Sequence, residues 1–143
     1  MPDANASNNG VVSVDLVNDR AEIERVEASI LERAEVFGYP RASLFAVKLA
    51  LEEAITNAFQ HGHRGLDPGL TVRVEYAVSP EEIRVGVEDQ GPGFDAAKVP
   101  DPTLDENLTC PSGRGLMLMR SYMTEVAYNG RGNRVDLVYR RRV

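Results

Sequence analysis

Apolar and polar residues alternate along five stretches of the chain, the pattern of β-strands with one buried face. The stretches are residues 11–17, 70–78, 83–88, 125–128 and 133–140. In the first of them Val12, Val14 and Leu16 share one face. Short turns at residues 79–81 and 129–132 join the second stretch to the third and the fourth to the fifth. Each pair is therefore predicted to form a hairpin.

A first helix is predicted over Arg20–Val36, where apolar residues recur at helical spacing. Asp19 suits the N-cap position, Glu22 follows it in capping-box position, and Gly38 comes after the helix end. The apolar stripe consists of Ile23, Val26, Ile30 and Ala34.

A second helix is predicted over residues 41–62, which contain no glycine or proline before Gly62. Its apolar stripe consists of Leu44, Val47, Leu51, Ile55 and Ala58. A separate row at spacing i, i+4, i+8 consists of Glu53, Asn57 and His61. The Glu53 carboxylate and the Asn57 carboxamide lie one turn apart near a helix end, so they can act together as oxygen ligands or proton acceptors at one place. Such a row is also common in helices that have only a structural role.

The order of these elements predicts an α+β fold, a two-layer α/β sandwich whose antiparallel or mixed sheet has helices on one face. Residues 94–112, with three prolines, are predicted to form a lid over a binding site, and residues 115–123 a short helix. A disordered tail is expected over residues 1–10 and a single domain over residues 11–143, because 143 residues, 43% of them hydrophobic, suffice for one core.

Charge and cysteine content narrow the function classes. The net charge of -6 argues against a general nucleic-acid or membrane-surface binder, because both partners are anionic. Cys110 is the only cysteine, so no internal disulfide can form. No apolar run approaches the length of a membrane span, and none follows a basic start as in a signal peptide, so we expect a cytoplasmic protein.

Two glycine motifs add candidate chemistry. Asp89-Gln90-Gly91-Pro92-Gly93 directly follows a predicted strand, where the glycines permit close backbone approach and the carboxylate can accept a hydrogen bond from a ligand amine. Residues 112–116, Ser-Gly-Arg-Gly-Leu, precede a predicted helix, whose free amide groups could hold phosphate. Each motif taken alone is typical of an ordinary turn or hinge.

Taken in order, the three segments resemble a known set of motifs. E-x-x-x-N near a helix end, D-x-G-x-G after a strand and G-x-G-L opening a helix resemble the N, G1 and G2 boxes of the GHKL (Bergerat-fold) ATPases. The resemblance covers Val11–Arg140. Within that superfamily, the compact length, the N-box ending at residues 58–62 and the Gly-Asn-Arg-Val of residues 132–135 resemble the bacterial anti-sigma factor serine/threonine kinases.

The resemblance implies roles for residues that match the motifs. Glu53 would be the general base that takes a proton from the attacking hydroxyl, and Asn57 would ligate the Mg²⁺ that bridges the phosphates of ATP. His61 would pack or hydrogen-bond beside the nucleotide. Asp89 would accept a hydrogen bond from the adenine amino group. The residues that would shape the pocket or close on the phosphates are Gly91, Gly93, Gly113, Arg114, Gly115 and Leu116. Asn133 stands where many relatives have a threonine near the adenine.

The resemblance also implies a function. The protein would phosphorylate a serine or threonine of an anti-sigma factor antagonist, a STAS-type protein, and would sequester a sigma factor, acting as a homodimer without contacting nucleic acid or membrane. Two alternatives remain open. One is a non-catalytic adaptor in which nucleotide only orders the lid for a partner. The other is the ATP-binding domain of a histidine kinase acting in trans.

Overall fold

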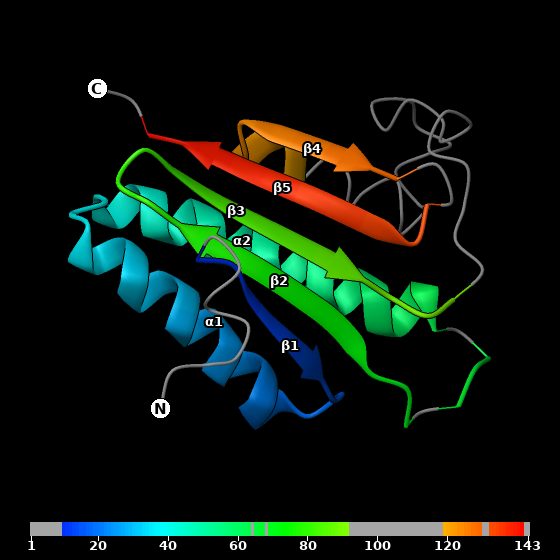
Figure 1. Cartoon of the computed structure of the whole chain (residues 1–143). Coiled ribbons are helices and arrows are strands. Elements are labelled where there is room, and N and C mark those ends of the chain that lie inside the picture. The colour runs from blue at the N-terminus through cyan, green and yellow to red at the C-terminus, as the bar shows by residue number, and fades with distance from the viewer. Residues whose placement is uncertain (1–9, 64, 68, 92–118, 130–131, 142–143) are drawn as a thin grey trace.

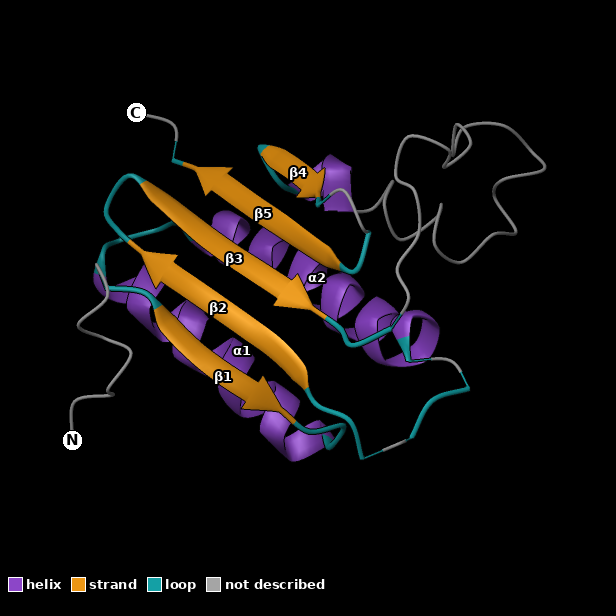
Figure 2. Ribbon diagram, turned by 45° about the vertical axis from the view of Figure 1, so that its right-hand side comes forward, coloured by secondary structure: helices purple, strands orange, loops and turns teal. Residues whose placement is uncertain are grey.

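A five-stranded antiparallel sheet with two long helices on one face forms the framework of the protein (Figures 1 and 2). The computed structural model describes residues 10–63, 65–67, 69–91, 119–129 and 132–141. In chain order the elements are β1 (Val12–Leu16), α1 (Arg20–Val36), α2 (Arg41–Asn57), η2 (Ala58–Gly62), β2 (Val72–Val78), β3 (Glu82–Glu88), β4 (Glu125–Tyr128) and β5 (Arg134–Arg140). The predicted α+β class is confirmed.

The strands lie in the order β1-β2-β3-β5-β4, and every neighbouring pair is antiparallel. Both predicted hairpins are present, with Val74 opposite Val87 in β2–β3 and Val126 opposite Leu137 in β4–β5. The long strands β3 and β5 pair along their whole length, so the end of β3 lies beside the start of β5. This end of the sheet brings together segments that are far apart in the sequence.

The core lies between the sheet and the helices. The predicted apolar stripes of α1 and α2 face the strands, and Ile30, Val47 and Leu51 are fully buried. From the sheet, Val74, Ile83 and Leu137 are equally inaccessible. Removal of these side chains from water is the main force that holds the two layers together.

The predicted start of α1 is correct, but its capping box is wrong. Asp19 is the N-cap residue, yet its side chain makes no capping hydrogen bond. The backbone N–H of Asp19 donates instead to the carbonyl of Val17 at 2.8 Å, so Glu22 has no donor to accept from. The Glu22 carboxylate pairs with Arg25 one turn further on, at 3.3 Å.

The predicted continuous helix over residues 41–62 is wrong in its last turn. The α-helix ends at Asn57, and Ala58–Gly62 form a π-helix. The N–H of His63 closes this wider turn by donating to the carbonyl of Ala58 at 3.1 Å. A π-turn places one more residue in the turn than an α-helix does, and such turns are frequent at functional sites.

Several predictions concern, wholly or in part, residues that the structure does not describe. Residues 1–9 of the expected tail and the whole of the expected lid, residues 94–112, lie outside the described residues. Of the short helix expected over residues 115–123, the described part is helical at residues 119–122. Among the helices that are described, none has both the length and the apolarity needed to cross a membrane.

Candidate functional site

The end of η2 and the turn that follows β3 are in direct contact, which brings two of the three predicted motifs together. A Cβ atom on Gly91 would lie 1.8 Å from the carbonyl oxygen of Gly62. A Cβ on Gly62 would lie 2.3 Å from the carboxylate carbon of Asp89. Gly91 is therefore required for the two backbones to approach this closely, and Gly62 for the Asp89 carboxylate to lie against the helix end.

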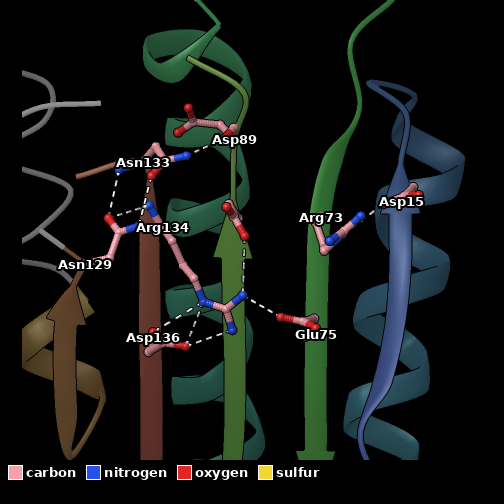
Figure 3. Close-up of polar contacts among 9 residues, drawn as sticks. Asp15, Arg73, Glu75, Asp89, Asn129, Asn133, Arg134 and Asp136 are labelled. Carbon is pink, nitrogen blue, oxygen red and sulfur yellow. Dashed lines mark hydrogen bonds and ion pairs between the residues drawn. The ribbon is translucent and has the colours of Figure 1, made fainter. Parts of the chain in front are cut away.

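The carboxylate of Asp89 shapes the turn that carries it. Its Oδ1 accepts the N–H of Gly91 at 2.7 Å, the bond of an Asx turn. Asn133, a buried residue at the start of β5, holds the Asp89 backbone from the other side. The Asp89 N–H donates to the Asn133 carbonyl at 2.8 Å, and Asn133 Nδ2 donates to the Asp89 carbonyl at 3.0 Å (Figure 3). Asp89 is therefore fixed in place, while its contact with an adenine stays a prediction, as does that of Asn133.

Asn129, which the sequence analysis did not single out, organises the connection that carries Asn133. Its Oδ1 accepts the backbone N–H groups of Gly132 at 2.7 Å, Asn133 at 3.1 Å and Arg134 at 3.3 Å. Its Nδ2 donates to Asn133 Oδ1 at 2.9 Å (Figure 3). The Asn-Gly pair at residues 129–130 predicts a turn, but these side-chain contacts could not be read from it.

His63 is a second residue that sequence reasoning did not assign to the site. Its side chain is buried, its ring meets Phe59 edge-on at a centroid distance of 5.8 Å, and its Nε2 accepts the backbone N–H of Gln90 at 2.9 Å. Gln90 is the middle residue of the turn between Asp89 and Gly91. The imidazole thus joins the helix end to this turn.

Glu53 and Asn57 lie on the last two turns of α2, and both are half-buried. Because the α-helix extends to Asn57, their spacing of four places both side chains on one side of the helix, as predicted. The predicted row does not continue regularly to His61, because that residue lies in the π-turn, and the His61 side chain is outside what the structure describes. Gly93, Gly113, Arg114, Gly115 and Leu116 also lie outside the described residues, so their roles stay predictions.

Tyr128, at the end of β4, shares the electrostatic environment of Asp89. Burial raises the pKa of Tyr128 to about 12, while the charge of Arg120 acts to lower it and that of Asp89 to raise it. The phenol therefore keeps its proton at neutral pH. No sequence pattern indicated this residue, because its place depends on the pairing of β4 with β5.

A cavity of about 270 Å³ lies on the other side of the turn after β3, on the sheet face away from the helices. It is lined by Asp15, Thr71, Arg73, Glu88, Asp89 and Gln90. Neither Glu53 nor Asn57 contributes to it, so it is not the cavity that the predicted motifs would form together.

Arg134 secures the same end of the sheet on this open face. Its guanidinium pairs with Glu75, with Glu88 at 3.5 Å and with Asp136 at 3.1 Å (Figure 3). It lies against Gly86, where an added Cβ would be 2.1 Å from Nη2. The end of β3 and the start of β5 are therefore held together directly beside Asp89 and Asn133.

Comparison with known proteins agrees with this geometry. The model of the histidine kinase-like ATPase domain matches residues 16–139. The chain belongs to this family. The family assignment confirms the resemblance drawn from the three motifs.

Relatives within the histidine kinase-like ATPase family include named protein kinases. The chain is 32% identical over 101 residues to the serine-protein kinase RsbW of Bacillus licheniformis, which covers 65% of this chain and 62% of the relative. It thus spans less than two thirds of that kinase's length. It is 30% identical over 100 residues to the anti-sigma F factor of Clostridium beijerinckii, covering 67% of this chain and 68% of the relative.

A solved structure shares the fold of this ATPase domain. A chain of the SiaB–SiaC complex from Pseudomonas aeruginosa superposes with a TM-score of 0.62 at 12% identity, covering 93% of this chain and 91% of that one. At this low identity the likeness concerns the fold alone.

Proposed function

We propose that the protein is an ATP- and Mg²⁺-binding serine/threonine kinase of the partner-switching type, which phosphorylates an anti-sigma factor antagonist and sequesters a sigma factor. The observation that carries the proposal is the contact of the N-box helix end with the Asp89–Gly91 turn, within a chain of the histidine kinase-like ATPase family. The two relatives named as a serine-protein kinase and an anti-sigma factor support the substrate class.

The side chains present fit Mg²⁺ and a nucleotide. Asn57 offers a half-buried carboxamide oxygen, a hard ligand of the kind that Mg²⁺ prefers, and the metal would neutralise charge on the phosphates. A side chain at position 62 would occupy the place of the Asp89 carboxylate, so Gly62 leaves this half-buried acceptor in the position that we propose for recognition of an adenine amino group. The donor set is therefore compatible with Mg·ATP.

In this mechanism Glu53 accepts the proton of the attacking serine or threonine hydroxyl. Its place one turn before Asn57 puts the base and the metal ligand on one side of α2. Asp89, fixed by Asn133 and Gly91, orients the base of the nucleotide. Positioning and charge neutralisation then supply most of the rate acceleration, as in other phosphoryl transfers.

The test is incubation of the protein with Mg·γ-labelled ATP and candidate antagonist proteins. Glu53→Gln is expected to bind ATP normally and to lose phosphate transfer by roughly 10²- to 10⁴-fold. Glu52→Gln is the matched control, because the neighbouring Glu52 carboxylate is bound by Arg20 at 3.2 Å and faces away from the row of Glu53. Asn57→Ala is expected to fold and to lose Mg·ATP binding.

The product and the variants separate the alternatives. An acid-stable phosphoserine or phosphothreonine supports the kinase, whereas an acid-labile phosphohistidine favours a histidine kinase domain acting in trans. Nucleotide-dependent partner binding without any transfer favours the adaptor. Transfer at the wild-type rate in Glu53→Gln, or unchanged nucleotide affinity in Asn57→Ala, contradicts the assigned roles.

A further inference from the structure

The junction between the helix end and the Asp89–Gly91 turn contains a side-chain hydrogen bond in addition to its close backbone contact. The backbone N–H of Gln90 donates to Nε2 of His63 across 27 positions of sequence, at 2.9 Å. His63 is only 7% exposed, so the acceptor of this part-buried bond is shielded from water. Partly buried hydrogen bonds contribute more than fully exposed ones, and removal of the acceptor leaves the Gln90 N–H without this partner.

The His63 ring is held in one orientation. The backbone N–H of His63 donates to the carbonyl of Ala58 and its backbone carbonyl accepts the N–H of Leu66 at 2.9 Å, which fixes the position of the residue. The imidazole ring then packs edge-on against Phe59. An imidazole nitrogen that accepts a hydrogen bond must carry a lone pair, so the ring proton of the neutral side chain is on Nδ1. His63 therefore acts as a fixed acceptor and does not offer Nε2 as a free nucleophile.

The residue that His63 holds is the centre of the proposed base-recognition turn. Gln90 lies between Asp89 and Gly91, and its side chain is anchored as well, with Nε2 donating to the Thr71 carbonyl at 2.9 Å. The Asx bond between Asp89 and Gly91 fixes the shape of the turn, but not its placement against the helices. The Gly62–Gly91 backbone contact brings the turn against the helix end, and the bond to His63 adds a directional side-chain link from the helical layer.

We propose that His63 is a positioning residue for adenine selection, acting through the Gln90 N–H to orient the Asp89 carboxylate without touching the nucleotide. This inference rests on the proposed function, because it concerns the same site. The competing explanation is that the imidazole serves only as packing beside Phe59. The two explanations differ in whether the acceptor nitrogen matters.

Two substitutions separate the acceptor from the ring. His63→Phe keeps an aromatic ring against Phe59 and removes the acceptor. His63→Gln removes the ring, but its amide oxygen can reach the position of Nε2. We expect His63→Phe to weaken ATP affinity roughly tenfold and to reduce the preference for ATP over GTP, because the turn loses its hydrogen bond to the helical layer. His63→Gln should restore both, and saturating ATP should restore the transfer rate of His63→Phe.

The hydrogen bond itself is measured without nucleotide. In the wild type, the ¹⁵N shifts of His63 should show the Nδ1–H tautomer, and the Gln90 amide should be protected from hydrogen exchange. Protection should fall in His63→Phe and remain in His63→Gln, with thermal denaturation showing that both variants fold. Should a variant fail to fold, the tautomer of the wild type still decides, since an Nε2–H tautomer overturns the inference.

The outcomes distinguish this inference from the proposed function. If the wild type prefers ATP and His63→Phe shows the same affinity and preference, the positioning role is wrong and the kinase proposal stands. If the wild type binds neither ATP nor GTP, the proposed function fails, and adenine selection fails with it. An affinity loss in His63→Gln that His63→Phe does not show assigns the residue to packing and overturns the inference. A loss in His63→Phe that His63→Gln does not restore shows that an acceptor at this position is not sufficient, and overturns it as well.

Discussion

The two ends of the sheet both join the helices to the strands, but by different means (Figure 1). At the end where β3 stops and β5 begins, the backbones of Gly62 and Gly91 touch, and no side chain separates them. At the opposite end, the side chain of Arg141 bridges the α1–α2 connection and the β2–β3 turn. Backbone contact fixes a position, whereas a long side chain mainly adds binding energy between parts already in place.

The Arg141 end is a set of separable interactions. The guanidinium donates to the carbonyls of Phe37 and Gly38, both at 2.6 Å, and lies 4.8 Å from the centre of the Tyr39 ring. Tyr39 donates to the Ser79 carbonyl at 2.8 Å. Each interaction can be lost without moving a backbone. The comparison therefore indicates that the close contact at the glycine end fixes the position of the backbone. The contacts of Arg141 at the other end contribute mainly to the free energy of unfolding.

The largest expected effect comes from Gly91→Ala. The new Cβ would lie 1.8 Å from the Gly62 carbonyl oxygen, so one of the two backbones must move. We expect a loss of about 3 kcal/mol in the free energy of unfolding, the upper part of the usual range for overpacking, and a fall in ATP affinity of roughly a hundredfold. Thermal denaturation and nucleotide titration measure the two quantities.

Gly65→Ala is the matched control for that substitution. Gly65 has a φ of +77°, but nothing lies within 4 Å of an added Cβ. It should cost only about 1 kcal/mol, from backbone strain, and leave nucleotide affinity unchanged. If Gly91→Ala also cost only about 1 kcal/mol and left ATP affinity unchanged, the close contact between Gly62 and Gly91 would not fix the site.

A smaller effect, confined to stability, is expected for Arg141→Ala. Removing the guanidinium leaves the Phe37 and Gly38 carbonyls without this donor and removes its contact with Tyr39. Because Arg141 is partly exposed, we expect a loss of about 2 kcal/mol in the free energy of unfolding, with ATP affinity unchanged. Denaturant unfolding measures the loss. Arg140→Ala, which breaks only surface ion pairs, is the control and should cost about 0–1 kcal/mol. A fall in ATP affinity in Arg141→Ala would show that this end also positions the site.

The difference between the two ends also explains what sequence could predict. The strands, the helix Arg20–Val36 and the buried faces follow from periodicity, a local property, and they were predicted almost residue by residue. The fold class follows from the order of these elements. Asp89 and Gly91 could be singled out because their motif directly follows a strand end, a local feature, although the contact that requires glycine at position 91 is with the distant Gly62.

The remaining site features depend on contacts between distant residues. The side chain of His63 meets the Gln90 N–H only in the folded chain, and Tyr128 comes near Asp89 only through the pairing of β4 with β5. The π-turn was missed because apolar spacing does not record one additional residue at a helix end. The capping box failed because the Val17 carbonyl had already taken the N–H that Glu22 was expected to bind.

Between the two ends, the buried Glu27 on α1 contacts Glu52 on α2, and its protonation tests how the two helices are held together. The residue is 2% exposed, and its Oε2 has no hydrogen-bond partner among the described residues. Burial, followed by a hydrogen bond with Glu52 on α2, raises the pKa of Glu27 from 4.5 to about 8. The pKa of Glu52 is lowered, chiefly by its hydrogen bond from Arg20. Glu27 is therefore the member of the pair that carries the proton at neutral pH.

This arrangement predicts stability that falls as pH rises. Between about pH 4.5 and 8 the folded protein binds a proton at Glu27 that the unfolded chain lacks, so this contribution is complete below that window and lost above it. The lowered pKa of Glu52 affects stability only in acid, below the same window.

Glu27→Gln mimics the protonated form, so its melting temperature should match that of the wild type near pH 5 and exceed it at pH 9. Glu24→Gln, on the exposed side of α1, should show no such pH-dependent gain. A difference between Glu27→Gln and the wild type that is the same at both pH values would show that Glu27 does not change its protonation state between them in the folded protein, which contradicts the raised pKa.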